Sequence, residues 1–374
     1  MSTETEHADH AQSGESGGMR FLVSSYRDWV AGEGVPLVED FAVDLRTTPV
    51  AGWPRFGVNG AVINVHGRGD FLDMWLMEVP PGQQMTPQHH LFEVVVYVIS
   101  GRGNTAIQVG DQTRSFEWGP KSMFALPLNA TYQIFNASGR EPARLALTTS
   151  FPIIMNLLRN ADMIFGTDFE FTERLQAPAE HFAGAGRAVT DWRNGKDHNM
   201  WETNFVPDLG VFAELKSLER RGKASKSIQF LLADGVTHTH MSEIPVGRYK
   251  KAHRHMGGTH IYPVTGRGYS LLWYEGTDPA DRVRVDWEHG FVYSPPDNMY
   301  HQHFNVSTEP ARYFAVKMGS YRFPVTARMN GQFAASDRTI RETKTQIEYE
   351  DQEPDIEEIY QAEMSKAGLV PEPR

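Results

Sequence analysis

Histidine residues gather in one stretch of the chain at spacings that suit a metal site. Eight of the fifteen His residues lie between positions 238 and 303. His253 and His255 are two residues apart, so on a strand both side chains leave the same face. His260 follows a pair of glycines, and His301 comes from a segment far along the chain. Imidazole binds first-row divalent metals, so these four residues are the expected ligands.

A shell of four imidazoles is neutral, unlike a shell that contains a carboxylate. A neutral shell keeps a divalent metal electrophilic and disfavours its higher oxidation states. Octahedral coordination leaves two positions, for a bidentate substrate or for a substrate and dioxygen. We expect one divalent transition metal per chain, Fe(II) first, with Ni(II) or Mn(II) as alternatives; imidazole also suits Cu and Zn.

Two further histidines are candidates for proton transfer. His303 follows His301 by two residues and should share its face, as a proton shuttle, a further ligand or a structural residue. His240 belongs to an alternating Thr-His-Thr-His run at 237–240. Its alternatives are a place in the pocket wall or on an exposed strand face. We take His303 and His240 as the expected catalytic residues.

The segment that carries these histidines is one of two copies of a repeated unit. Residues 75–103 and 240–268 align without a gap at a shift of 165, and later segments align at shifts of 168 or 169. The aligned residues include Glu78 and Glu243, Gly82 and Gly247, Asn129 and Asn298, Asn136 and Asn305, Arg102 and Arg267, and Arg144 and Arg312. The first copy spans about 41–155 and the second about 205–324. Arginines that recur in both copies indicate a structural role.

Both copies read as short β-strands separated by Gly, Pro and Asn turns. The runs 94–99, 144–148 and 313–317 are β-branched or aromatic and of strand length. Such spacing is typical of a β-sandwich or barrel. Between the copies, 153–165 has helical spacing, whereas 181–199 reads as a loop. Near the C-terminus, a helix is expected from Pro354 to Gly368 with Ile356, Tyr360 and Met364 on one face.

The second copy resembles the cupin family at a first motif. That motif is Gly, five residues, His-x-His, three or four residues, an acid, and then Gly. It matches at Gly247, His253, His255 and Gly266. His260 stands in place of the usual acid.

A second cupin motif follows in the same copy. It is Gly, five residues, Pro-x-Gly, two residues, His, three residues, and Asn. Gly290, Pro296, His301 and Asn305 match at every spacing, with Asn298 where the family prefers Gly. The resemblance implies an all-β fold of two tandem cupin (double-stranded β-helix, jelly-roll) barrels, with a helical linker and a C-terminal helix.

The first copy lacks the ligand set. The aligned positions there hold Gln88, His90, Val95 and Tyr132. A single His beside these side chains is not a transition-metal site. We therefore expect a degenerate first barrel that serves structure, an interface or regulation.

Composition limits the classes of protein. The chain of 374 residues has no Cys, which excludes disulfides, thiolate zinc sites, iron–sulfur clusters and a Cys nucleophile. The net charge of −11 comes almost entirely from the tails, because residues 1–18 and 341–374 together carry −10. A near-neutral body argues against nucleic-acid binding. No apolar run reaches the length of a membrane span, and the N-terminus lacks a secretory signal, so we expect a cytoplasmic protein.

The expected organisation has five parts. These are a disordered tail at 1–18, a degenerate cupin at 19–155, a linker at 156–204, a metal-binding cupin at 205–324 and an acidic arm with a helix at 325–374. The arm is expected to pack on its own or a neighbouring subunit, and a homo-oligomer is expected because bicupins often assemble further.

Three functions remain open. The first is a metal-dependent dioxygenase that cleaves an aromatic ring or a C–C bond of a small chelating substrate with O₂. It resembles the bicupin gentisate 1,2-dioxygenase-like group, although that group carries its metal in the N-terminal copy. The second is a redox-neutral lyase, isomerase or decarboxylase that uses the metal as a Lewis acid. The third is a binding cupin without enzymatic activity.

Overall fold

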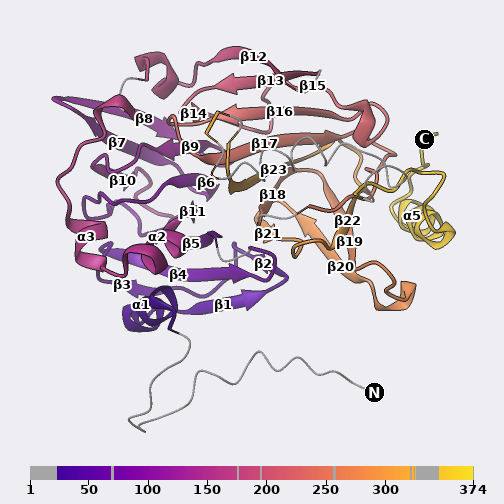
Figure 1. Cartoon of the computed structure of the whole chain (residues 1–374), viewed down its shortest axis with the longest axis horizontal. Coiled ribbons are helices and arrows are strands. Elements are labelled where there is room, and N and C mark those ends of the chain that lie inside the picture. Colours follow the sequence, from indigo (N-terminus) through magenta and orange to yellow (C-terminus); the bar gives the residue numbers. More distant parts are fainter. Residues whose placement is uncertain are drawn as a thin grey trace, which may run out of the picture.

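The chain folds into two β-barrels of the same topology that pack against each other (Figure 1). The computed structural model describes residues 23–68, 71–174, 177–193, 196–255, 258–320, 322–323, 325 and 345–373. Each barrel consists of a large sheet and a three-stranded sheet, so the expected fold of two tandem jelly-roll barrels is confirmed. Among the described residues, no helix is long and apolar enough to cross a membrane.

The N-terminal barrel precedes two short helices. Its large sheet contains β1 (Leu37–Asp40), β3 (Ala51–Trp53), β4 (Val58–Val65), β5 (Asp73–Val79), β6 (Val94–Ser100), β9 (Met123–Leu126) and β11 (Ala143–Thr149). Its small sheet contains β7 (Gly103–Val109), β8 (Gln112–Trp118) and β10 (Tyr132–Asn136). Helices α1 (Ser25–Glu33), α2 (Phe151–Leu158) and α3 (Ala161–Gly166) add apolar side chains to its core. The helical spacing at 153–165 thus forms two helices rather than one.

The C-terminal barrel repeats this plan. Its large sheet contains β12 (Arg187–Arg193), β13 (Lys196–Glu202), β15 (Lys216–Ser217), β16 (Lys226–Leu231), β17 (Thr237–Ile244), β18 (His260–Thr265), β21 (Phe291–Tyr293) and β23 (Ala311–Met318). Its small sheet contains β19 (Arg267–Trp273), β20 (Val283–Glu288) and β22 (Tyr300–Asn305). Short 3₁₀ helices lie at Thr172–Arg174, Ala179–Phe182, Glu219–Arg221 and Pro279–Asp281.

The segment 181–199, expected to be a loop, is largely extended. Strands β12 and β13 form an antiparallel hairpin, and β13 pairs in parallel with β16. These strands form because their backbone N–H and C=O groups pair with neighbouring strands, and such pairing does not require a run of residues with high strand propensity. The local sequence at 181–199 therefore did not indicate strands.

Recurring residues hold both barrels by the same contacts. Arg144 pairs with Glu78 and donates to the carbonyl oxygens of residues 45 and 48. Arg312 pairs with Glu243 and donates to the carbonyl oxygens of residues 209, 210 and 212. Asn136 and Asn305 each donate to three backbone carbonyl oxygens at equivalent turns. The repeat in the sequence is therefore a repeat of specific structural interactions.

Each copy also lends its first strand to the other barrel. Strand β2 (Ala42–Asp44), from the first copy, pairs with β21 of the C-terminal barrel. Strand β14 (Phe205–Val206), from the second copy, pairs with β9 of the N-terminal barrel. The segments 41–45 and 205–209 are thus exchanged, and domain boundaries drawn at 19 and 205 assign each of these strands to the barrel that it does not complete.

The two large sheets enclose an apolar layer between the barrels. This layer, named here the inter-barrel core, includes Met74, Leu76 and Tyr97 from one sheet and Met241, Phe314 and Val316 from the other. Tyr97 and Phe314 pack edge to face with ring centroids 4.7 Å apart. Such a layer buries apolar area as the interior of a single domain would.

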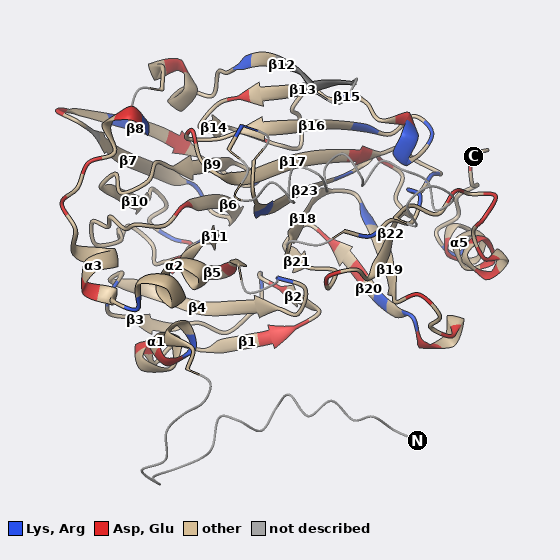
Figure 2. Ribbon diagram, viewed as in Figure 1, with Lys and Arg blue, Asp and Glu red and all other residues tan. Residues whose placement is uncertain are grey.

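The C-terminal arm packs on the outside of its own C-terminal barrel. Helix α5 (Pro354–Lys366) confirms the expected C-terminal helix, and it buries Ile356, Tyr360 and Met364. These side chains join a cluster with Tyr249 and Phe304 on the outer face of the small sheet. Acidic residues of the helix also pair with arginines of the barrel, including Glu363 with Arg284 at 3.1 Å. Figure 2 shows the acidic positions along the ribbon of α5. The apolar face of α5 is therefore covered within the chain itself.

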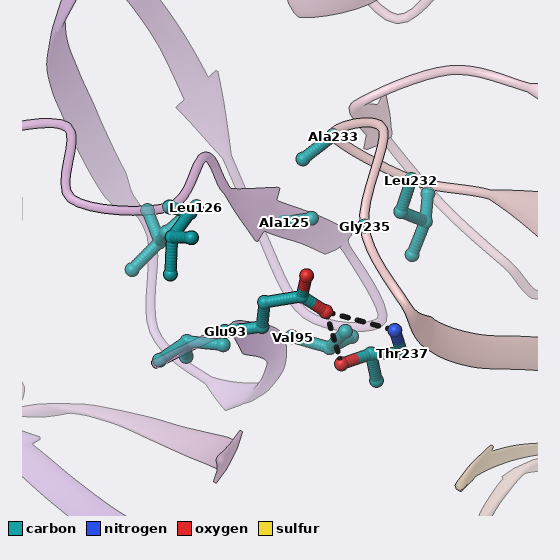
Figure 3. Close-up of a pocket in the computed structure, with 10 residues that line it drawn as sticks. Glu93, Val95, Ala125, Leu126, Leu232, Ala233, Gly235 and Thr237 are labelled. Carbon is teal, nitrogen blue, oxygen red and sulfur yellow. Dashed lines mark hydrogen bonds between the residues drawn. The ribbon is translucent and has the colours of Figure 1, made fainter. Parts of the chain in front are cut away.

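Glu93 joins the barrels at a buried junction (Figure 3). One carboxylate oxygen accepts from the Val236 N–H at 2.9 Å and the Arg174 guanidinium at 2.7 Å. The other accepts from the Thr237 N–H at 2.8 Å and the Thr237 hydroxyl at 2.7 Å. The side chain is only 10% exposed, so the carboxylate replaces water for four donors.

Substitution of this carboxylate should destabilise the whole fold. Glu93→Ala leaves the buried donors without an acceptor, and we expect the free energy of unfolding to fall by about 3 kcal/mol. Chemical denaturation followed by fluorescence measures the change. Glu117→Ala, at an exposed position of β8, is the control and should change stability by less than about 0.5 kcal/mol. Equal effects of the two substitutions would contradict this role of Glu93.

Candidate metal centre

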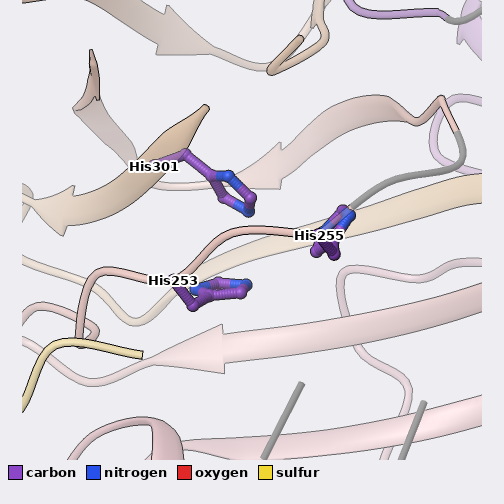
Figure 4. Close-up of side chains that lie close together, drawn as sticks. All are labelled: His253, His255 and His301. Atoms are coloured by element: carbon purple, nitrogen blue, oxygen red, sulfur yellow. The ribbon is translucent and has the colours of Figure 1, made fainter. Parts of the chain in front are cut away.

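Two distant segments meet in the C-terminal barrel to form the histidine cluster. The segment before β18 runs antiparallel to β22, and His253 and His301 form a bridge between them. The His253 N–H donates to the His301 carbonyl at 3.1 Å, and the His301 N–H donates to the His253 carbonyl at 2.9 Å. This reciprocal pair fixes the two side chains next to each other. His255 lies two residues further along and turns toward the same space (Figure 4).

His253, His255 and His301 have the geometry of a metal-binding set. One ring nitrogen from each lies within 4.8 Å of the others. Metal–nitrogen bonds of about 2 Å place neighbouring ligand atoms roughly 3 Å apart, so side-chain shifts of about 1 Å bring the three onto one ion. The donor set is entirely imidazole, which suits a divalent transition metal.

The candidate ligand nitrogens are held in the neutral form that metal binding requires. Burial lowers the pKa of His301 to about 4. Burial also lowers the pKa values of His253 and His255 well below the usual range, and nearby cations and imidazoles add to the effect. The Nδ1 of His301 lies 3.1 Å from the Met299 carbonyl oxygen, which can only accept. His301 therefore donates from Nδ1 and presents Nε2 to a ligand.

The structure does not bring His260 to the other three histidines. His260 lies opposite Val316, and Tyr262 lies opposite Phe314. Tyr262, Phe314 and Val316 belong to the inter-barrel core, whereas the intervening Ile261 belongs to the barrel interior. Because side chains alternate along a strand, His260 faces the inter-barrel core.

The residue on the inner face at this point is Thr259. It shares the alternation of Ile261, and its buried hydroxyl has no hydrogen-bond partner among the described residues. The motif tolerates three or four residues before its acid. A spacing of four places His260 at that position, whereas a spacing of three places Thr259 there. A shift of one residue reverses the face to which a side chain points. Among the described residues, the structure therefore brings three of the four expected imidazoles together.

His303 lies beside the cluster and is firmly oriented. Its Nδ1 is 2.8 Å from the Ser270 hydroxyl and 3.1 Å from the Tyr293 hydroxyl. Trp287 in turn donates to Ser270 at 2.9 Å. The His303 ring centroid is 5.5 Å from that of His301. With Nδ1 engaged, Nε2 is the atom that can exchange a proton with a ligand.

His240 also reaches this interior. On β17 it lies opposite Ala315, a residue of the barrel interior. Its Nδ1 is buried and has no partner within the described part of the chain. Burial is the main cause that lowers the pKa values of His255 and His303, and the nearby His240 lowers them further.

The first barrel has the same backbone pairing at this point, but different side chains fill its interior. Gln88 and Tyr132 form the bridge equivalent to that of His253 and His301. The His90 ring stacks on Phe92 at 3.7 Å, its Nδ1 is 2.9 Å from the Phe92 carbonyl oxygen, and its Nε2 is 3.1 Å from the Tyr132 hydroxyl. Both nitrogens of His90 are therefore engaged inside the barrel.

Two polar residues of the C-terminal interior, Lys250 and Tyr313, were not among the expected site residues. Lys250 aligns with Met85 and Tyr313 with Leu145, and both counterparts are fully buried apolar residues of the first barrel. The backbone confirms the first match, because Met85 N–H donates to Ile134 as Lys250 N–H donates to His303. The sequence signal that could have identified these two residues is a polar residue in the second copy aligned with an apolar residue in the first.

The architecture is that of two tandem jelly-roll barrels, with the histidine cluster in the second barrel. No protein-family model and no curated protein matches the sequence. Solved structures resemble the chain at low sequence identity and with TM-scores below 0.5.

These solved structures include a vicilin and two oxalate decarboxylases. The vicilin from Corylus avellana (hazelnut) is 10% identical, with a TM-score of 0.46 over 81% of this chain and 96% of that chain. The Lactobacillus farciminis oxalate decarboxylase is 13% identical, with a TM-score of 0.46 over 80% and 93%. The Bacillus subtilis oxalate decarboxylase is 16% identical, with a TM-score of 0.45 over 76% and 78%.

Metal content should separate the three clustered histidines from His260. His301→Ala removes one of three ligands, and we expect bound metal to fall from near one ion per chain to below about one tenth of that. His260→Phe should leave the metal content unchanged. Elemental analysis of tag-free protein measures both. Loss of metal in His260→Phe with full retention in His301→Ala would contradict the assignment.

His90 should make the stability of the fold sensitive to acid. Burial lowers its pKa to about 3, whereas an unfolded His takes up a proton below about 6.5. The unfolded state therefore binds more protons between these values, and stability falls as the pH decreases. Relative to His90→Gln, the wild type should lose up to about 1.4 kcal/mol more per pH unit in this range. Parallel denaturation curves at pH 7, 6 and 5 measure it; identical slopes would contradict it.

Proposed function

We propose that the C-terminal barrel binds one divalent transition metal through His253, His255 and His301, and that the protein is a metal-dependent dioxygenase. The observation that supports this proposal is the convergence of three neutral imidazoles. The substrate is a small organic molecule that chelates the metal. Fe(II) is the proposed metal, with Ni(II) or Mn(II) as alternatives.

The number of protein ligands favours a reaction with two reactants. Three imidazoles leave three positions of an octahedral ion for other ligands, one more than four imidazoles would leave. A bidentate substrate and O₂ together require three positions. When bound, the ion supplies Lewis acidity and, if it is redox-active, the means to activate dioxygen.

The residues around the cluster supply orientation and proton transfer. His303 is fixed by Ser270 and Tyr293, so its Nε2 can accept a proton from a substrate hydroxyl or return one to the product. Burial holds the pKa of His303 well below its usual range, so the ring begins as a base. His240, with Nδ1 buried and without a described partner, is a second proton acceptor.

A redox-neutral lyase, isomerase or decarboxylase is the alternative function. The buried amine of Lys250 favours it, because burial lowers the pKa of this group to about 7, where it can gain or lose a proton. Proton transfer alone suffices for such a reaction, and O₂ is not consumed. A binding protein without activity would be left if metal is absent.

Oxygen uptake tests the proposal. Metal-loaded protein screened against phenolic acids and diketones should consume O₂ with at least one of them. His303→Gln should lower kcat by about 10²-fold or more while metal content stays unchanged, because proton transfer by His303 is lost. His289→Gln is the matched control, since His289 bonds Tyr97 and a backbone carbonyl between the barrels. Turnover without O₂ uptake would instead establish the redox-neutral alternative.

A further inference from the structure

Lys250 carries its charge into the interior of the metal-binding barrel. It lies three residues before His253, and its N–H donates to the His303 carbonyl at 3.0 Å. The side chain is only 2% exposed. Its Nζ lies 3.1 Å from the Tyr313 hydroxyl and 5.0 Å from the centroid of the Tyr313 ring.

No carboxylate among the described residues pairs with this ammonium group. An ammonium has three donors, and Tyr313 accounts for one of them. Lys250 lowers the pKa of two nearby histidines, His240 of β17 and His303 of β22. Two arginines of the 3₁₀ helix 219–221, Arg220 and Arg221, lower the pKa of Lys250. All four of these groups are neutral or cationic. Burial first, and then these arginines, lower the Lys250 pKa to about 7.

The fold does not require a charge at this position. The equivalent residue of the first barrel is Met85, which is fully buried and keeps the same backbone hydrogen bond to the adjacent strand. An unpaired ammonium in such a place destabilises the protein. A ligand that brings a negative charge would compensate for this cost.

We propose that Lys250 binds an anionic oxygen, such as a carboxylate, of the molecule that the histidine cluster holds. This inference rests on the proposed function and narrows its substrate class to organic acids. The acid group lies on the side of the cluster where His303 and Tyr313 are found, while the chelating atoms face the three imidazoles. Tyr313 orients the ammonium through its hydroxyl.

The proposal has a definite pH dependence. An anion binds the protonated, positively charged form of Lys250, and this form is lost as the pH rises above about 7. The affinity of the protein for an organic acid should therefore fall above that pH. Affinity for an uncharged chelator should not follow this pattern. The groups nearest to Lys250 remain neutral histidines and tyrosines in this range.

A matched pair of chelators tests the proposal. The probes are 3,4-dihydroxybenzoate and its uncharged amide, which share a catechol and differ in one charge distant from it. Calorimetric titration of Zn(II)-loaded protein measures both affinities without turnover. The wild type should bind the acid at least tenfold more tightly than the amide. Lys250→Met, which installs the residue of the first barrel, should abolish this preference, and Lys250→Arg should retain part of it.

Lys251→Met is the control, because Lys251 pairs with Glu348 outside the barrel. It should preserve the preference. Equal affinities of the wild type for acid and amide, or a preference that persists in Lys250→Met, would overturn the proposal. Zinc content is measured on every sample. A wild type that does not bind zinc would overturn the proposed function itself, whereas a zinc-loaded wild type without preference overturns only the role of Lys250.

Discussion

The reciprocal backbone pair between His253 and His301 is the interaction on which the candidate site depends. These residues come from segments that are nearly fifty positions apart, and two hydrogen bonds of 2.9 and 3.1 Å hold them side by side. The same bonds position Lys250, because its own N–H continues the pairing to His303. The arm near the C-terminus extends this arrangement from the other side, where Gln346 bridges to His253 and accepts from Arg221 at 2.8 Å.

The two barrels show how one backbone frame supports two different interiors. In the first, the bridge of Gln88 and Tyr132 surrounds a His whose nitrogens are both engaged, and an apolar core fills the rest. In the second, imidazoles, an amine and hydroxyls occupy equivalent places. Buried polar groups are costly unless they are satisfied, so the polar interior of the second barrel lowers its packing stability relative to the first. The shared apolar layer between the barrels compensates for part of this loss.

Much of this organisation could be predicted from the sequence, because the repeat and the turn residues carry specific contacts. Arg144 and Arg312 have the structural role that their recurrence indicated. The aligned residues Asn136 and Asn305 make equivalent contacts in the two barrels. The spacing of the histidines in the sequence predicted that four would lie together, and three of them do. The spacing could not predict which face of its strand His260 occupies. The strands at 187–202 and the exchanged strands depend on pairing with distant partners, which no local pattern records.

The exchange of β2 and β14 makes the two barrels one thermodynamic unit. A sheet that loses its borrowed strand exposes a row of unpaired backbone groups, so neither half of the chain has a complete native state of its own. A ligand bound in the second barrel therefore stabilises the first through mass action, although the first barrel never touches that ligand. The first copy would thus share in the binding energy of any ligand of the second barrel.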